Sequence, residues 1–276
     1  MEEELIKQLS ENKSSSDEKK NDQNEENKEK KNVTINEDKN EVKTIESKKK
    51  KIIIGLPGDH FSSKFIISWT STLNTLWESG KYDVIISPGT SSYVTFARMQ
   101  TLGLDVLKGI TQQPFNNMEF DIWVTIDSDV IFSPQQFIEL IESTEKYPVV
   151  SGMYRMVDLK SYAIVKDWNV DYFKNNGTFQ FLTPEFVETW KKENNNPFMD
   201  VSYCGMGFMA IKKEVLSTLT YPYFQGDLTE IKGKNGELIR DLNSEDVCFC
   251  KNITKAGFKI MINTNIRVGH LKSLVI

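Results

Sequence analysis

Short apolar runs alternate with stretches of helical spacing in the first part of the folded region. The runs at 51–55, 82–87 and 122–126 end at Gly, Pro or Asp, and they predict β-strands. Apolar positions over 65–77 and 93–107 recur at the spacing of one helix face and predict two helices. Strands and helices in alternation predict a parallel sheet with helices on both of its faces.

The second part of the chain has one sharply marked helix start. Ser133, Pro134 and Gln136 give a capping box with proline at the first helical position. The other expectations, in chain order, are a strand at 149–152, an irregular stretch at 153–197, a strand region at 201–211, a helix at 212–219, a mobile loop at 225–243, a helix at 245–256, and strands at 259–262 and 266–268.

Composition sets residues 1–50 apart from the rest. They hold 12 Lys and 14 Asp or Glu, with no aromatic residue, Gly, Pro or Cys. Such a stretch cannot bury enough apolar surface to offset its conformational entropy, so we expect a disordered, charged arm. Residues 51–276 contain all the Phe, Tyr and Trp of the chain and are long enough for one α/β domain.

Charge and patterning exclude several classes of partner. The net charge of −5, without basic clusters in the folded region, argues against nucleic acid as the main partner. No apolar run approaches the roughly 18 residues that a membrane span needs, and residues 1–20 lack the pattern of a signal peptide. We therefore expect a cytoplasmic protein. Its three cysteines, Cys204, Cys248 and Cys250, are odd in number and lie in mostly apolar surroundings, so we expect reduced core thiols. The C-x-C pair with His270 is too small a ligand set for zinc.

The strongest chemical signal is Asp127-Ser128-Asp129, directly after the apolar strand 122–126. Burying a charge is costly unless another charge neutralises it. Two acids at the exposed end of a strand therefore indicate a bound cation, which in turn would bind a phosphorylated ligand. Ligands of open α/β sheets bind beyond the carboxyl ends of the strands, which is where these acids are predicted to lie.

Four motifs in order give the chain a resemblance to a known family. They are the segments 126–132 (IDSDVIF), 203–208 (YCGMGF), 244–250 (SEDVCFC) and 268–270 (VGH). Over roughly residues 51–273 the chain resembles the GT-A nucleotide-sugar glycosyltransferases, particularly small cytosolic members of viral or algal type. The resemblance implies a single Rossmann-like α/β domain with a mainly parallel central sheet and a small second sheet near the C-terminus. It also implies a nucleotide-binding half at 51–152 and an acceptor-binding half at 153–276.

The resemblance implies a divalent metal site. Asp129 would bind the cation directly, Asp127 would hold the donor ribose or a metal-bound water, and His270 would be the C-terminal ligand. Carboxylate oxygens suit Mn²⁺ or Mg²⁺, and the imidazole favours Mn²⁺. Alternatively, the two acids only cap the loop before Ser133, and His270 is an ordinary surface histidine.

The resemblance also assigns the catalytic acids. Asp246 would be the general base that takes the proton of the acceptor hydroxyl, with Glu245 contacting the acceptor or the metal shell. The competing interpretation is that two acids in a first helical turn merely stabilise the helix dipole.

Several further residues would bind the donor in related enzymes. Arg98 would face the diphosphate, and a solvated helix charge is an equally good interpretation. The remaining expected donor contacts are Pro57, Gly58, Asp59 and Ser128, and also Gly205, Met206 and Gly207 along the sugar; simple turns or a β-bulge would explain the same residues. One or two aromatic residues are expected to line the acceptor cleft, out of Trp168, Trp190, Tyr221, Tyr223 and Phe224.

These implications predict a metal-dependent hexosyl- or pentosyltransferase. It would move a sugar from a nucleoside-diphosphate donor, with UDP favoured, to a hydroxyl of a glycan or other acceptor, with inversion. One alternative is a phosphatase or phosphotransferase with Asp127 as nucleophile; that class usually has Thr or Val where this chain has Ile131. The other alternative is a sugar-binding module without catalysis.

Overall fold

The computed structural model describes residues 48–272. The predicted arm at 1–50 therefore lies outside the described residues, except for its last three. The strands are β1 Lys50–Pro57, β2 Tyr82–Gly89, β3 Ile122–Ile126, β4 Val130–Ile131, β5 Val149–Met153, β6 Ile164–Val165, β7 Phe198–Val201, β8 Tyr203–Cys204, β9 Phe208–Lys212, β10 Leu228–Lys232, β11 Leu238–Leu242, β12 Ile260–Arg267 and β13 Gly269–His270. The helices are α2 Ser63–Ser79, α3 Val94–Thr101, α4 Pro134–Ser143, α5 Val170–Asn176, α6 Pro184–Asn194, α7 Lys213–Leu216 and α8 Glu245–Lys255, with short 3-10 turns at Val106–Lys108 and Pro114–Asn117.

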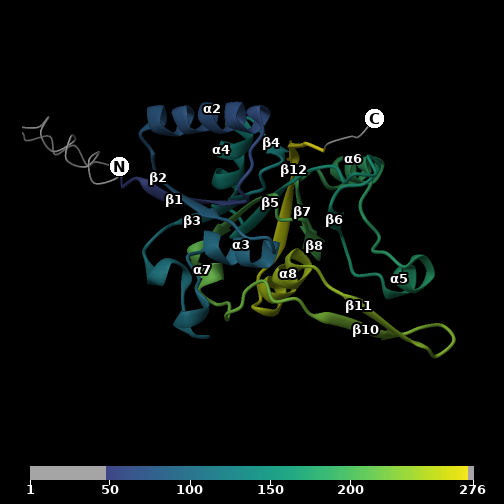
Figure 1. Ribbon diagram of the computed structural model, residues 1–276. Coiled ribbons are helices and arrows are strands. Elements are labelled where there is room, and N and C mark those ends of the chain that lie inside the picture. The colour runs from purple at the N-terminus through teal and green to yellow at the C-terminus, as the bar shows by residue number, and fades with distance from the viewer. Residues whose placement is uncertain (1–47, 273–276) are drawn as a thin grey trace, which may run out of the picture. The chain divides into compact units, whose positions relative to one another are not determined.

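A seven-stranded sheet in the order β2-β1-β3-β9-β5-β12-β7 forms the centre of the described unit (Figure 1). β1 pairs in parallel with β2 and β3, and β5 pairs in parallel with β12. β9 lies antiparallel between β3 and β5, and β7 is antiparallel to β12. The prediction of a mainly parallel α/β sheet is confirmed, and two antiparallel strands are added to it.

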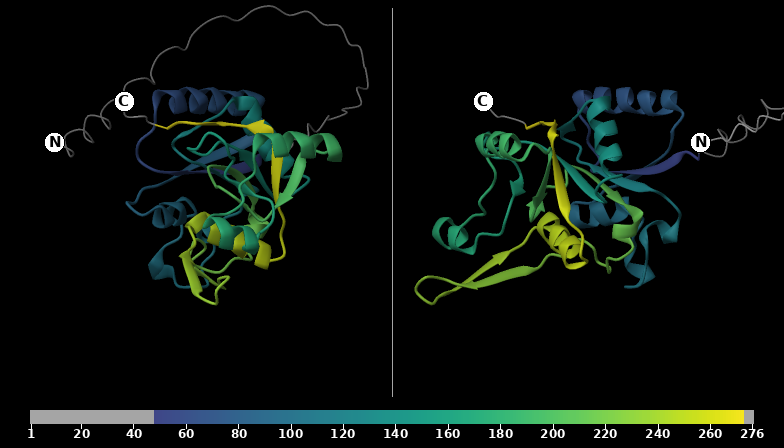
Figure 2. Two further views of the ribbon diagram at one scale, coloured as in Figure 1. Left: turned by 90° about the vertical axis from the view of Figure 1, so that its right-hand side faces the viewer. Right: turned by 180° about the vertical axis from the view of Figure 1, so that it is seen from behind.

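Helices cover both faces of this sheet, as predicted (Figures 1 and 2). Alternate residues of β1 point to opposite faces: Ile52 and Ile54 belong to the core cluster that includes residues of α2 and α4, whereas Ile53 belongs to the cluster that includes residues of α3 and α8. All three are fully buried, which explains why the strand reads as a continuous apolar run.

Several predicted elements needed correction. The helix expected over 93–107 ends at Thr101, because Gly103 adopts a positive φ of 64° and turns the chain. The stretch at 153–197 is not irregular: Asn169 and Thr183 cap α5 and α6. The region 201–211 is divided into β8 and β9, and the helix after it is the short α7.

The stretch 225–243, expected to be a loop, also needs correction, because it contains two regular strands. β10 and β11 form a hairpin there, with Ile231 opposite Ile239 and an ion pair between Glu230 and Arg240. The two strands expected after residue 258 are one strand, β12, whose register shifts between Ile262 and Arg267. The predicted small sheet near the C-terminus is confirmed as the pair of β13 and β4.

No helix among residues 48–272 is long and apolar enough to cross a membrane. The three cysteines are buried and form no disulfide.

Candidate active site

Asp127 and Asp129 follow β3 at the edge of the sheet where the parallel strands β1, β2 and β3 end. The backbone N–H of Asp127 donates to the carbonyl of Gly207 at 3.0 Å, so the Asp127-Ser128-Asp129 and Gly205-Met206-Gly207 segments lie side by side. A cleft of about 280 Å³ opens at this edge. It is lined by Pro57, Gly58, Ser91, Ser92, Val94, Ala97, Arg98, Asp127, Ser128 and Asp129.

Arg98 is a buried cation between two acids. Its Nη1 and Nη2 donate to the two oxygens of Asp127 at 3.0 and 3.2 Å, and its Nε donates to Glu245 at 3.3 Å. Only 4% of Arg98 is exposed. Burial alone lowers the pKa of Arg98, but the carboxylate of Asp127, assisted by Glu245, raises that pKa above its usual range. The guanidinium thus stays charged and fixes both acids, instead of projecting freely into the cleft.

Asp129 is shared by two basic side chains. The pairing of His270 with Val130 across β13 and β4 places the imidazole Nε2 3.2 Å from Oδ2 of Asp129, and the ammonium of Lys272 lies 2.6 Å from the same oxygen. Burial acts to raise the pKa of Asp129, but hydrogen bonds from His270 and Lys272 lower it to about 2. The hydrogen bond to Asp129 raises the pKa of His270, against the effect of burial.

The ring of His270 is oriented by the backbone. Its Nδ1 lies 2.7 Å from the carbonyl of Arg155, which can only accept, so Nδ1 carries the proton. In neutral His270 the lone pair of Nε2 therefore faces the carboxylate of Asp129. Two electron-rich atoms so close together require a positive charge between them, which a proton or a metal ion can supply.

The carboxylate of Asp129 and the imidazole of His270 are suitable ligands for a divalent cation such as Mn²⁺ or Mg²⁺, which the phosphates of a substrate help to bind. Among residues 48–272 no three His, Cys, Asp or Glu side chains converge on one point. Mg²⁺ and Mn²⁺ need no full protein cage when a diphosphate supplies the other oxygens. Lys272 would have to leave Asp129 if a cation took its place.

Asp246 stands at the start of α8 with both oxygens in use. Tyr203 donates its hydroxyl hydrogen to Oδ2 at 2.7 Å, the Val247 N–H donates to Oδ1 at 2.8 Å, and the hydroxyl of Ser244 donates to the same Oδ1. Burial raises the pKa of Tyr203, and the charge of Asp246 raises it further, so the phenol stays a donor. The carboxylate is thereby held in one orientation.

Tyr154 occupies the space behind the two glycines. A Cβ added to Gly205 would lie 2.0 Å from its hydroxyl oxygen, and one added to Gly207 would lie 3.0 Å from its ring. Gly207 donates its N–H to the hydroxyl at 3.2 Å, and the ring packs edge-on against His270 at 4.8 Å. Glycine at both positions is explained by this contact. Their expected contact with a donor sugar stays a prediction.

The other expected donor residues divide into two groups. Pro57, Gly58 and Ser128 line the cleft. Asp59 is exposed and lies 2.5 Å from the exposed His60, and Met206 is fully buried in the core. Neither Asp59 nor Met206 lines the cleft at 127–129.

Sequence reasoning missed Ser91, Ser92, Tyr154, Tyr203 and Lys272. The two serines follow the end of a predicted strand, and the carboxyl ends of parallel strands meet at one edge, so their position was a usable signal. Tyr203 opens the 203–208 motif but was given no role of its own, and nothing local marks Tyr154; the partners of both tyrosines lie far away in the sequence.

Comparison with known proteins gives structural likeness only. No protein-family model matches the chain, and no curated protein does. Crystal structures similar to it include A197 from STIV (17% identity, TM-score 0.44, covering 81% of this chain and 86% of that one). Another similar solved structure is the inositol-1-phosphate CTP transferase from T. maritima (11% identity, TM-score 0.39, covering 81% of this chain and 90% of that one). A third is glucosyl-3-phosphoglycerate synthase from Mycobacterium tuberculosis, solved with Mn²⁺, UDP and phosphoglyceric acid (13% identity, TM-score 0.38, covering 82% of this chain and 72% of that one).

Proposed function

We propose that this chain is a metal-dependent glycosyltransferase that moves a sugar from a nucleoside-diphosphate donor, UDP before other nucleotides, to an acceptor hydroxyl. One observation carries the proposal: Asp127 and Asp129 line the carboxyl-end cleft, buried Arg98 joins Asp127 to Glu245 of α8, and His270 of β13 contacts Asp129. A structural role alone does not require such a concentration of charge beside an open cleft.

The cleft offers groups for a nucleotide. The N-terminus of α3, with Ser91 and Ser92 before it, presents N–H and hydroxyl donors toward the space beside Asp127. Gly58 adopts a φ of +120°, and a Cβ there would lie 3.2 Å from the hydroxyl of Ser128, so the loop after β1 packs closely on the 127–129 segment. Ribose and base would lie along this loop.

Asp129 and His270 would hold Mn²⁺ or Mg²⁺. When bound, the cation would neutralise the charge that develops on the departing diphosphate. Asp127 would receive the ribose or a metal-bound water on an oxygen already oriented by Arg98. Nη2 of Arg98 carries a second hydrogen that does not bond to Asp127. This hydrogen would be donated to an oxygen of the nucleotide sugar.

Asp246 would accept the proton of the acceptor hydroxyl. The acceptor oxygen forms a bond to the anomeric carbon as the bond to the diphosphate oxygen breaks, and the leaving nucleotide takes the electron pair. Attack opposite to the leaving group inverts the configuration. Oδ1 of Asp246 already accepts two hydrogen bonds, so the remaining lone pair of Oδ2 is the one that would take the proton.

A thermal-shift panel of nucleotide sugars, with and without Mn²⁺, tests the proposal. We expect a nucleoside-diphosphate sugar to raise the melting temperature only when Mn²⁺ is present, and slow hydrolysis of that donor to follow. If no nucleotide sugar changes the melting temperature under either condition, the proposal fails.

The two alternatives have their own tests. In a phosphotransferase Asp127 would attack phosphorus, but both of its oxygens accept hydrogen bonds from Arg98. A phosphoenzyme trapped at Asp127 would nevertheless establish that class. Metal-dependent donor hydrolysis would exclude a binding module without catalysis.

A further inference from the structure

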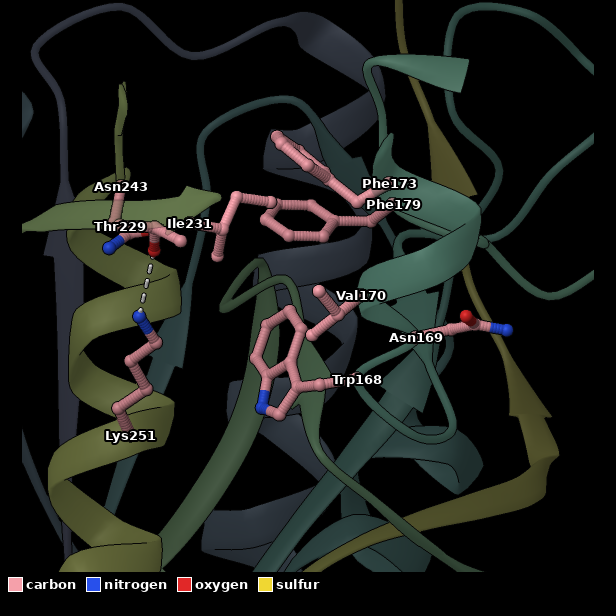
Figure 3. A pocket seen from close by; sticks show the side chains of 9 residues that line it. All are labelled: Trp168, Asn169, Val170, Phe173, Phe179, Thr229, Ile231, Asn243 and Lys251. Carbon is pink, nitrogen blue, oxygen red and sulfur yellow. Dashed lines mark hydrogen bonds between the residues drawn. The ribbon is translucent and has the colours of Figure 1, made fainter. Parts of the chain in front are cut away.

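A second, mostly apolar pocket lies between the α5 segment and the β10–β11 hairpin (Figure 3). Its volume is about 110 Å³, less than that of a whole small-molecule site but close to the roughly 150 Å³ of an apolar cavity that takes up one benzene ring. It is lined by Trp168, Asn169, Val170, Phe173, Phe179, Thr229, Ile231, Asn243 and Lys251.

Three aromatic rings form one wall. The rings of Trp168 and Phe179 meet edge to face at 5.0 Å, and those of Phe173 and Phe179 lie 5.3 Å apart. Ile231 faces them from the hairpin (Figure 3). Trp168 is still 36% exposed, so its indole offers surface that another planar ring could cover.

The polar groups of the opposite wall are already engaged with one another. Thr229 donates its hydroxyl hydrogen to Asn243 at 3.0 Å and accepts from Lys251 at 3.3 Å. Asn243 in turn donates to Asp227 at 3.1 Å. Most of the lining is apolar, so a sugar ring entering here would leave most of its hydroxyls without a partner, which is costly. An aromatic ring has no such requirement.

The side chain of Asn169, which also lines the pocket, is likewise hydrogen-bonded within the protein. Its side-chain oxygen caps α5 by accepting from the N–H of Tyr172 at 2.8 Å, and its amide donates to Gln180 at 3.1 Å. The pocket therefore selects its ligand by shape and apolar contact.

The pocket adjoins the proposed general base. The ring of Trp168 lies 6.2 Å from that of Tyr203, whose hydroxyl donates to Asp246. Two lining residues are also close to Asp246 in the sequence: Asn243 lies three residues before it, and Lys251 lies on the same helix, α8. A molecule seated on Trp168 could thus extend a hydroxyl toward Asp246.

We propose that the acceptor carries an aromatic ring and that this ring occupies the pocket of Trp168, Phe179 and Ile231. The inference rests on the proposed function, because it assigns the acceptor of that reaction. It specifies an aryl group beside the hydroxyl that receives the sugar. Free phenols, aryl glycosides and tyrosine side chains share this chemistry.

Binding can be measured without any turnover. We would titrate ¹⁵N-labelled protein with p-nitrophenyl β-glucoside, methyl β-glucoside and n-octyl β-glucoside, and follow the indole N–H signal of Trp168, assigned with the variant Trp168→Phe. The aryl glucoside should shift this signal saturably, with an affinity at least about tenfold above that of the methyl glucoside. Equal affinities, or tighter binding of the octyl glucoside, would overturn the aromatic assignment.

Two arginine variants of the hairpin provide a matched pair. Ile231→Arg places a cation in the pocket beside Lys251, whereas Leu238→Arg places one on the opposite, exposed face of the hairpin. The first should lose at least about tenfold in affinity for the aryl glucoside, and the second should keep it. Equal losses in both variants, at unchanged melting temperatures, would contradict the proposed location.

The outcomes separate this inference from the proposed function. Metal-dependent donor hydrolysis without any response of Trp168 to aryl compounds would overturn the inference alone. A response of Trp168 in a protein that binds no nucleotide sugar would overturn the proposed function, and with it the assignment of the ligand as an acceptor. Transfer to a panel of tyrosine peptides, simple phenols and aryl glycosides would then identify the source of the ring.

Discussion

Arg98 binds Asp127 through two parallel hydrogen bonds, from Nη1 to Oδ1 at 3.0 Å and from Nη2 to Oδ2 at 3.2 Å. The same guanidinium reaches Glu245 from its Nε. Arg98 is therefore not a solvated helix residue. It connects the 127–129 segment to Glu245 at the start of α8.

Replacing Arg98 by Met should destabilise the protein. Asp127 and Glu245 would lose their shared counter-charge, and breaking such a pair costs roughly 2–4 kcal/mol when the acids keep some access to water. Urea unfolding measures this loss. The matched control is Arg240→Met, whose exposed ion pair with Glu230 should contribute less than about 1 kcal/mol. Equal changes in both variants would contradict a structural role for the buried pair.

The variant Asp246→Asn should stop transfer and keep the donor. The amide cannot accept the acceptor proton, so turnover should fall by roughly two to four orders of magnitude. Calorimetry with the nucleotide sugar and Mn²⁺ should give an almost unchanged affinity. Asp83→Asn, on the exposed side of β2, serves as the control and should leave turnover unchanged. If Asp246→Asn also abolishes donor binding, Asp246 is not primarily a base.

Removing the ammonium of Lys272 should strengthen metal binding. Its nitrogen lies 2.6 Å from Oδ2 of Asp129, so a cation and Lys272 compete for that oxygen. Titration of Mn²⁺ with UDP, followed by electron paramagnetic resonance, should give tighter binding to Lys272→Met than to the parent protein, and weaker binding to Asp129→Asn. Lys259→Met removes an ion pair with Asp200 instead and should change nothing. Weaker Mn²⁺ binding by Lys272→Met would mean that the lysine assists the site.

The variant Gly205→Ala tests the contact behind the site. Its methyl group would lie 2.0 Å from the hydroxyl oxygen of Tyr154, so the tyrosine ring, which packs edge-on against His270, must shift. Overpacking of this kind costs typically about 1–3 kcal/mol, and the shift of His270 should also reduce Mn²⁺ affinity. Gly226→Ala is the control, since its nearest neighbour would be 3.9 Å away. A fully stable Gly205→Ala variant with normal Mn²⁺ binding would show that the packing tolerates the methyl group.

Local signals account for the parts of the structure that the sequence predicts well. The all-apolar strand at 122–126 and the capping box of Ser133 and Gln136 depend on neighbours a few residues away, and both are present. The hairpin at 228–242 was missed because polar residues and glycines dominate the stretch, although Ile231 lies between two polar residues and Asn235-Gly236 is a hairpin-turn signal.

The contacts that shape the site are long-range. Arg98 and Glu245 are 147 residues apart, and Tyr203 and Asp246 are 43 apart. A single sequence gives the residue types but not such pairings, which depend on where the sheet places each strand end. The order of the motifs suggested which acids lie together. The contacts of Tyr154, Tyr203 and Lys272 became apparent only from the three-dimensional structure.

The place of β9 in the sheet has a consequence for how this protein can be divided. A cleavage after residue 152 would separate β3 and β5 from the strand that hydrogen-bonds to both of them. The upstream piece would carry a gap between β3 and β5, and the downstream piece would hold the missing strand with bare N–H and C=O groups on either side. Neither fragment can complete the sheet by itself, so the two would form the native sheet only by associating with each other.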